Sequence, residues 1–208
     1  MNKVILWFFL LALLVSCSSN NPQVLLKSEF TNAGVFQASS SEYGIAQVKD
    51  GLLHLKVIQP GGMFITKAGL DQRDVSSQVS GLPQTNAGQV YYGLICRMVN
   101  KDNLIAFSIS TSGDIKIIQL VDGVQINLAK IGQGEKIPAN YGDRINVIKA
   151  DCVGNNLTFS INGVQVLSAK DSSPQFGDTA LFISSAQPPQ TVLFDSLLVT
   201  IPTEVAPE

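Results

Sequence analysis

The stretch NLTFSINGVQVLSA, residues 156–169, carries the pattern that decides the fold. Leu157, Phe159 and Ile161 alternate with polar residues, as they do in a β-strand that buries one face. The dipeptide Asn162-Gly163 follows, and it accepts the positive φ angles of a two-residue hairpin turn at low cost. Apolar residues then resume on the other side of the dipeptide. The stretch therefore predicts two antiparallel strands joined by a tight turn.

The same pattern of short apolar runs, cut by Gly, Asn and Asp, recurs from Val24 to Ile201. No stretch of eleven or more residues keeps the 3.6-residue stripe of an amphipathic helix. So many short strands need two packed sheets, because a single open sheet would leave an apolar face in water. The sequence predicts an all-β fold, a two-sheet antiparallel β-sandwich of the jelly-roll type over residues 24–201. We expect strands near 27–30, 45–49, 52–58, 62–67, 75–82, 92–99, 103–110, 114–121, 125–131, 143–152, 156–161 with 164–169, and 178–184 with 191–201.

The composition excludes several classes of function. The 208 residues include 14 Lys and Arg against 16 Asp and Glu, a formal net charge of −2. A chain without basic excess has no electrostatic attraction for a polyanion, so we expect no nucleic-acid partner. One histidine and three cysteines offer little for metal chemistry, and we expect no cofactor. The alternative is a calcium ion, to which the carboxylates of Asp102, Asp114, Asp143 or Asp195 could contribute oxygen ligands.

The first sixteen residues are typical of an export signal and not of a fold. Lys3 supplies a positive charge, and Val4 to Val15 is an unbroken apolar run. This run is shorter than the roughly 18–20 residues that a membrane-spanning helix needs. Residues 1–16 are therefore predicted to be a signal peptide that is removed from the mature protein.

The end of this leader, Leu14-Val15-Ser16-Cys17, resembles the lipobox of bacterial lipoproteins. The resemblance implies cleavage before Cys17, a lipid on its sulfur and a membrane anchor in the bacterial cell envelope. Residues 17–23 would be a polar tether, and residues 202–208 a flexible tail. Ser18 after the cysteine implies the outer membrane if the cell is Gram-negative, and otherwise the cell surface. The alternative is an ordinary secretory signal beside an incidental cysteine.

Cysteine counting predicts one disulfide. With Cys17 assigned to lipid, Cys96 and Cys152 remain, and two thiols in an exported protein allow a single pairing. Closing a loop of this length would stabilise the fold by about 4 kcal/mol in the loop-entropy model. The alternative is two separately buried free thiols.

Five segments together resemble the concanavalin A-like jelly-roll superfamily, in particular laminin-G-like domains and the 3-keto-disaccharide hydrolase-type domains of bacterial envelope proteins. They are GLICR (93–97), DNLIAFSIS (102–110), GDIKI (113–117), CVGNNLTFSING (152–163) and VLFDSLLV (192–199). The resemblance implies a fold that binds or cleaves glycans. In similar domains, cysteines at the positions of Cys96 and Cys152 commonly pair.

The residues favour binding over catalysis. Glucanases of this superfamily carry Glu-x-Asp-x-x-Glu on one strand, so that two carboxyl groups line the cleft, and that spacing does not occur here. His54 is the only histidine, and strand parity places it beside Lys56 on the wetter face, so we expect an exposed strand residue and not the imidazole of a catalytic triad. A hydrolase that uses acids such as Asp102 or Asp114 is kept as the alternative.

A sugar platform needs aromatic rings flanked by amide or guanidinium groups. Tyr91-Tyr92 precedes a strand that carries Arg97, and Asn103 follows in the next turn. We predict Tyr92, Arg97 and Asn103 as a ligand-binding group on the concave sheet. The leading hypothesis is an envelope-anchored lipoprotein that acts as a non-catalytic binding or adhesion module for glycans or a neighbouring envelope protein. A structural lipoprotein without a small ligand is the third possibility.

Overall fold

The structure, a computed structural model, describes residues 21–84, 88–132, 137–171 and 176–202. These residues form fifteen β-strands and no helix, so the predicted all-β fold is confirmed. The strands are β1 (Gln23–Ser28), β2 (Ser39–Ser40), β3 (Gly44–Lys49), β4 (Leu52–Val57), β5 (Met63–Gln72), β6 (Val75–Gln84), β7 (Tyr91–Asn100), β8 (Asn103–Ser110), β9 (Ile115–Val121), β10 (Val124–Ile131), β11 (Asn146–Val153), β12 (Asn156–Ile161), β13 (Val164–Lys170), β14 (Gly177–Ser184) and β15 (Gln190–Ile201).

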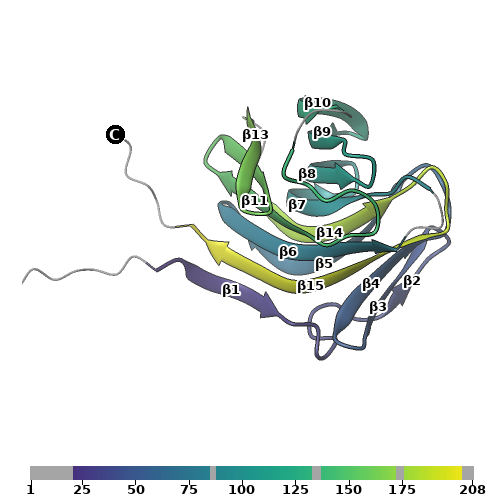
Figure 1. Cartoon of the computed structure of the whole chain (residues 1–208). Helices are drawn as coiled ribbons and strands as arrows, with labels where there is room; N and C mark the ends of the chain where they lie inside the picture. The colour runs from purple at the N-terminus through teal and green to yellow at the C-terminus, as the bar shows by residue number, and fades with distance from the viewer. Residues whose placement is uncertain (1–20, 85–87, 133–136, 172–175, 203–208) are drawn as a thin grey trace, which may run out of the picture.

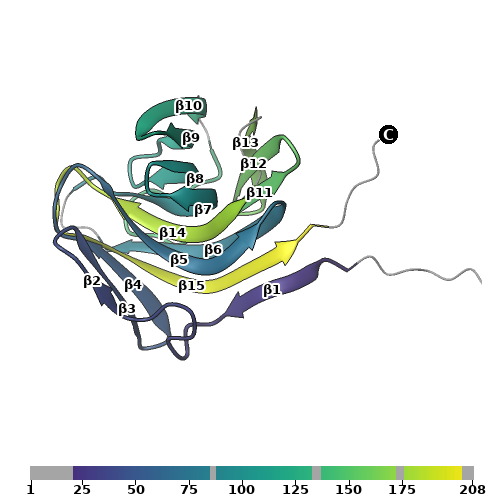
Figure 2. The ribbon, with the colours of Figure 1, turned by 180° about the vertical axis from the view of Figure 1, so that it is seen from behind.

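Two antiparallel sheets make up the sandwich. The nine-stranded sheet A has the order β13-β12-β11-β6-β15-β4-β3-β2, with β1 paired to β15. The six-stranded sheet B has the order β10-β9-β8-β7-β14-β5, and its strands β7 to β10 form a continuous meander. Figures 1 and 2 show β5, β6, β14 and β15 bent in the same direction, with β14 inside the curve of β15. The face of sheet B that points away from sheet A is therefore the concave one.

The core lies between the two sheets and follows the alternation of the sequence. In β8, Ile105 and Phe107 are buried in this core, and Phe107 packs edge-on against Phe159 of β12 with ring centroids 5.6 Å apart. Burying a side chain of this size stabilises the fold by roughly 1.5–3 kcal/mol. The predicted disulfide is confirmed, because Cys96 of β7 is bonded to Cys152 of β11 and so joins sheet B to sheet A.

The predicted turns are confirmed more closely than the predicted strand ends. Asn162 and Gly163 have φ angles of 50° and 83° in the β12–β13 hairpin, as the sequence indicates. The first strand begins at Gln23 instead of near residue 27, and the two-residue β2 was not predicted. The first difference comes from pairing with a distant strand, because β1 is held by the end of β15. The short β2 pairs with its neighbour β3. Local periodicity does not record such partners.

The predicted signal peptide (1–16) and Cys17 lie outside the described residues, as does the tail beyond Pro202. Within the ranges that the structure does describe, there is no helix of the length and apolar character needed to cross a bilayer.

Candidate functional site

The outer face of sheet B, which points away from sheet A, is apolar at its centre. The strand registers place four side chains in one row across this face: Ala180, Ile95, Ala106 and Ile118. All four are at most 9% exposed, and every member of this outer cluster comes from sheet B. A single sheet can shelter its own outward side chains in this way when it curves around them, in agreement with the bend of β14 in Figure 1.

The next row crosses the same face beside the first. It runs through Phe182, Gly93, Ser108 and Lys116. A Cβ on Gly93 would lie 1.9 Å from the carbonyl oxygen of Phe107 and 3.1 Å from the ring of Phe182. The missing side chain of Gly93 therefore allows β7 to approach β8 closely and leaves room for the Phe182 ring.

A polar group, which we call the Tyr91 cluster, lies at the end of this face where β7 begins and β8 ends. The Tyr91 hydroxyl donates to Asp114 Oδ2 at 2.9 Å, and Gln89 Nε2 donates to the same oxygen at 3.1 Å. The ammonium of Lys116 lies 5.1 Å from the centroid of the Tyr91 ring, a distance at which a cation is attracted to an aromatic face. The cluster consists of Gln89, Tyr91, Ser110, Ser112, Asp114 and Lys116.

The loop between β8 and β9 holds the carboxylate of this cluster in place. The backbone N–H of Asp114 donates to Ser110 Oγ at 2.9 Å, and Gln89 Nε2 also donates to Ser112 Oγ. Partial burial, and then the hydrogen bond to Asp114, raise the pKa of Tyr91 to about 12. Tyr91 therefore keeps its proton at neutral pH and remains the donor. Apart from Ser110, the members of the cluster are half-buried, so a ligand can reach them.

Tyr92 does not face outward from sheet B, so that part of the prediction is corrected. Its side chain lies between the sheets at 1% exposure, with its ring against Phe194 and its hydroxyl accepting a hydrogen bond from Asn146 Nδ2 at 3.1 Å. Burial raises its pKa to about 12. Strand parity could have shown this: Cys96 must point to the core to bridge the sheets, and Tyr92 is four residues away on the same face. Tyr91 is consequently the outward tyrosine.

Arg97 forms a buried connection between the sheets. It has a φ of 53° where the pairing of β7 with β8 is irregular. Its Nη2 donates to the carbonyl oxygen of Gly154 and lies 3.9 Å from Asp74 Oδ1, while Nη1 lies 3.5 Å from Asp171 Oδ2. Burial lowers the pKa of Arg97, and the two carboxylates oppose that effect. Nε has no hydrogen-bond partner among the described residues, and a buried unpaired N–H costs roughly 1–3 kcal/mol.

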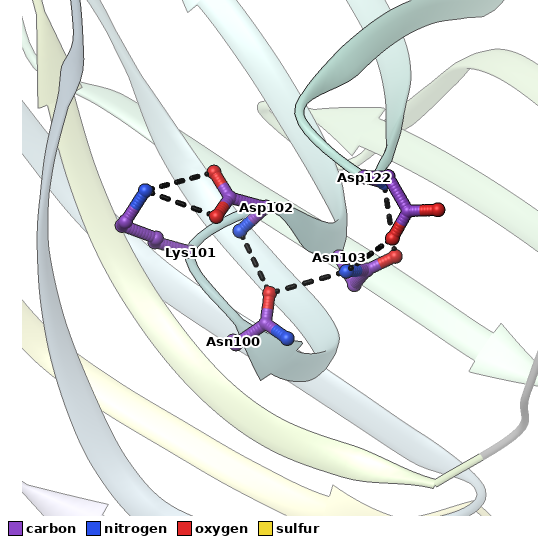
Figure 3. Close-up of polar contacts among 5 residues, drawn as sticks. All are labelled: Asn100, Lys101, Asp102, Asn103 and Asp122. Atoms are coloured by element: carbon purple, nitrogen blue, oxygen red, sulfur yellow. Dashed lines mark hydrogen bonds and ion pairs between the residues drawn. The ribbon is translucent and has the colours of Figure 1, made fainter.

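Arg97 and Asn103 are brought together in the lining of one pocket of about 230 Å³, which we call the Arg97 pocket. Asn103 lies at its rim, where Nδ2 donates to Asn100 Oδ1 and to Asp122 Oδ1, both at 3.3 Å. Figure 3 shows how these contacts tie the β7–β8 turn to the β9–β10 turn. Of the three predicted residues, two therefore share a pocket and Tyr92 does not. The lining consists of Arg97, Val99, Asn103, Leu104, Ile105, Gln119, Leu120 and Val121.

The two acids kept for a hydrolase do not face each other. Asp102 precedes β8, and Asp114 follows it. The eight residues of β8, at about 3.3 Å each, separate them by roughly 25 Å. Glycosidases need two carboxyl groups roughly 5–9 Å apart, so these two acids are not such a pair. His54 lies beside Lys56 in β4 on the outer face of sheet A, away from both sites.

The four carboxylates considered for calcium are also spread over the molecule. Asp195 lies in β15 of sheet A, whereas Asp102 and Asp114 lie at opposite ends of β8 in sheet B. Within the described residues, no three His, Cys, Asp or Glu side chains are grouped as metal ligands would be.

Comparisons with known proteins show similarity in structure. No family model and no curated protein sequence matches the chain. A protein of unknown function with a galectin-like fold from Bacillus subtilis superimposes with a TM-score of 0.63 at 13% identity, covering 86% of this chain and 96% of the other. A carbohydrate-binding module from Bacillus subtilis gives a TM-score of 0.60 at 13% identity, covering 79% and 91%. A β-glucanase from Bacillus licheniformis gives 0.60 at 12% identity, covering 88% and 100%.

These neighbours share the fold. They confirm a two-sheet jelly roll of the kind that the concanavalin A-like resemblance implies. At 12–13% identity, this similarity shows the fold alone, and the ligand of this chain has to be inferred from its own residues.

Proposed function

We propose that this protein is an envelope-anchored lipoprotein whose β-sandwich binds a glycan without cleaving it. The observation that supports the proposal most directly is the Tyr91 cluster. It combines a half-buried aromatic ring with a carboxylate, an amide and an ammonium on one face of sheet B. Sugar rings present both apolar C–H faces and hydroxyl groups, and this combination complements both.

In such a complex, members of the cluster would either bind the sugar or hold one another in position. Asp114 accepts hydrogen bonds through its carboxylate and, by engaging Tyr91 and Gln89, holds both side chains in position. Lys116 can donate to ring oxygens or hydroxyls while it remains near the Tyr91 ring. Because these side chains already contact one another, little rotamer entropy is lost when a ligand binds.

The acid positions support binding in preference to hydrolysis. Asp114 is the one carboxylate of the cluster, and the Asp102 alternative lies at the far end of β8. A similar fold occurs both in a carbohydrate-binding module and in a glucanase. The choice between glycan binding and glycan hydrolysis therefore rests on the arrangement of the acidic residues and not on the fold.

The anchoring part of the proposal rests on the leader and on Cys17. The first strand begins at Gln23, six residues after Cys17. A tether of this length reaches at most about 20 Å when extended. The sandwich would stay close to the membrane surface in the cell envelope. Mass spectrometry of the exported protein is expected to find an acylated Cys17 as the N-terminal residue, and an unmodified N-terminus would contradict the anchor alone.

The glycan part is tested by binding measurements on an array of bacterial and plant polysaccharides. Tyr91→Ala is expected to lower the affinity for the bound glycan at least tenfold, because it removes both the ring and the donor to Asp114. The matched control is Tyr43→Ala, since Tyr43 is 52% exposed and is not part of the cluster. Equal affinity of the two variants would contradict the assignment of the Tyr91 cluster.

An envelope protein is the second candidate ligand that the sequence leaves open. Ile95, Ala106 and Ile118 at the centre of the same face are at most 9% exposed, so they provide little surface to either ligand. A pull-down from solubilised envelopes is the corresponding measurement. Absence of any glycan on the array together with absence of a partner in the pull-down would leave the structural-lipoprotein alternative.

A further inference from the structure

Two turns at one end of sheet B carry exposed valines. Val99 lies near the end of β7, before the turn to β8, and Val121 and Val124 flank the turn between β9 and β10. The two turns are joined, because the backbone N–H of Gly123 donates to the carbonyl oxygen of Asp102 at 2.9 Å. Figure 3 shows the side-chain contacts that also connect them. The three valines therefore belong to the same end of the sandwich.

Phe176 extends this apolar surface. It precedes Gly177, the first residue of β14, whose Cα lies against the backbone near the end of β7. The side chains of Val99, Val121, Val124 and Phe176 are between 40% and 65% exposed, and we call these four residues the apolar end. Exposed apolar side chains that gather in one region mark a contact with a protein or a membrane.

The predicted membrane tether joins the sandwich at this same end. Gln23 begins β1 and pairs with Ile201 at the end of β15, and Figure 1 shows these two strand ends side by side. The end of β15 also pairs with the start of β6. Asp74, just before β6, lies 3.9 Å from the guanidinium of Arg97, near the end of β7. The start of β1 and the apolar end are therefore on one side of the molecule.

The opposite end of the sandwich also has exposed apolar residues, but they lie too far from the tether. Tyr141 packs over Gly113, just after β8, and the eight residues of β8 separate the two ends by roughly 25 Å. The tether from Cys17 to Gln23 extends at most about 20 Å. A lipid on Cys17 would therefore hold the apolar end against the membrane, and not the end with Tyr141, Ile145 and Val164.

The charges on the two turns favour an apolar contact over an electrostatic one. Lys101 is bound to Asp102 at 2.9 Å, and Asp122 adds a second carboxylate. Anionic lipids attract surfaces with an excess of Lys and Arg, and these two turns carry no such excess. The apolar side chains would instead lie at the boundary between headgroups and acyl chains, where their burial is favourable.

We propose that the apolar end lies on the surface of the membrane that holds the Cys17 lipid, and that this contact orients the sandwich. The inference rests on the proposed function, because it requires the lipid anchor. The Tyr91 cluster lies at the opposite end of β8. This orientation directs the cluster away from the bilayer, where a polysaccharide can reach it.

The sequence allows a direct test, because Trp7, its one tryptophan, lies in the predicted signal peptide. A tryptophan introduced elsewhere is then the single fluorescent probe of the exported protein. Phe176→Trp and Val124→Trp are made in the full chain, and the acylated products are reconstituted into phosphatidylcholine vesicles that carry bromine near the headgroup end of the acyl chains. Both probes are expected to shift their emission to the blue and to lose most of their fluorescence, because bromine quenches tryptophan at close range.

Val164→Trp is the matched control. Val164 is 52% exposed and begins β13 at the opposite end of the sandwich. Its probe is expected to keep the emission of a tryptophan in water and to escape quenching by bromine. Quenching of this probe to the same degree as the other two would show that the sandwich has no preferred orientation, and would overturn the proposal.

Vesicle flotation of the same samples separates this inference from the proposed anchor. Flotation with unquenched probes at both positions of the apolar end would reject the membrane contact and leave the anchor in place. A protein that does not float would reject both. Quenched probes on a floating protein without an acyl group would support the contact and reject the lipid on Cys17. A blue shift without quenching would assign the apolar end to a protein contact and overturn the proposal.

Discussion

At the scale of single residues, the adjacent Tyr91 and Tyr92 show how strand parity separates function from stability. Tyr92 packs against Phe194 in the core, and Tyr91 lies on the outer face with Asp114. A shift of one residue along a strand exchanges the interior for the outer face, because successive side chains point to opposite faces. Two identical side chains therefore contribute to different properties of the protein.

Alanine substitutions are expected to reveal this difference in the free energy of unfolding. Tyr92→Ala should lower it by about 3–5 kcal/mol, because it leaves a ring-sized cavity between the sheets. Tyr91→Ala should lower it by about 1 kcal/mol or less, as expected for a half-exposed side chain. Urea denaturation followed by circular dichroism measures both values. A larger loss for Tyr91→Ala than for Tyr92→Ala would contradict the assigned faces.

The two tyrosines also predict how stability depends on pH. Burial raises the pKa of Tyr92 to about 12, and burial with Asp114 does the same for Tyr91. The unfolded chain releases these protons near pH 10, whereas the folded chain retains them. The stabilisation is therefore complete below pH 10 and is lost as the pH rises from 10 to 12.

Denaturant titrations between pH 8 and pH 12 measure this loss. Tyr92→Phe should make the decline between pH 10 and pH 12 shallower than in the unmodified protein. A decline of equal steepness in the two proteins would show that Tyr92 is not responsible for it.

At the scale of elements, the meander β7–β8–β9 contributes residues to both the Tyr91 cluster and the Arg97 pocket. Its turns position Asp114 at one end and Asn103 at the other, and the length of β8 separates them. Regular alternation made these strands and turns predictable from the sequence. The irregular pairing at Arg97 was not predictable, because it depends on contacts with Asp74, Gly154 and Asp171 from distant parts of the chain.

The close approach of β7 to β8 can be tested at Gly93. Gly93→Ala is expected to lower the free energy of unfolding by about 2–3 kcal/mol, because the added methyl group collides with the backbone of Phe107. Gly132→Ala is the matched control, since among the described residues a Cβ there meets no atom within 4 Å. Thermal unfolding compares the two variants, and equal melting temperatures would exclude the predicted collision.

At the scale of the whole molecule, the disulfide cross-links two sheets that also meet through apolar contacts and through the polar contacts of Arg97 and Tyr92. Cys96 and Cys152 are 56 residues apart in the chain. The double variant Cys96→Ala with Cys152→Ala is expected to lose about 4 kcal/mol of stability, because its unfolded chain gains conformational freedom. Dithiothreitol should lower the unfolding midpoint of the unmodified protein and leave that of the double variant unchanged. A midpoint insensitive to reduction in both proteins would contradict this role.

The sequence by itself determined the all-β class, the turn at Asn162-Gly163 and the pairing of Cys96 with Cys152. These features depend on local alternation, on the conformational freedom of Asn and Gly, and on the small number of cysteines. Features of this kind can be predicted from the sequence because they are set by residues that are neighbours along the chain.

Only the tertiary structure decided which residues form a site. It placed Arg97 among carboxylates from distant parts of the chain, and it separated Asp102 from Asp114 by the length of β8. The physical reason is that strand pairing and sheet packing join segments far apart in sequence, and a single chain carries no local mark of its distant partners.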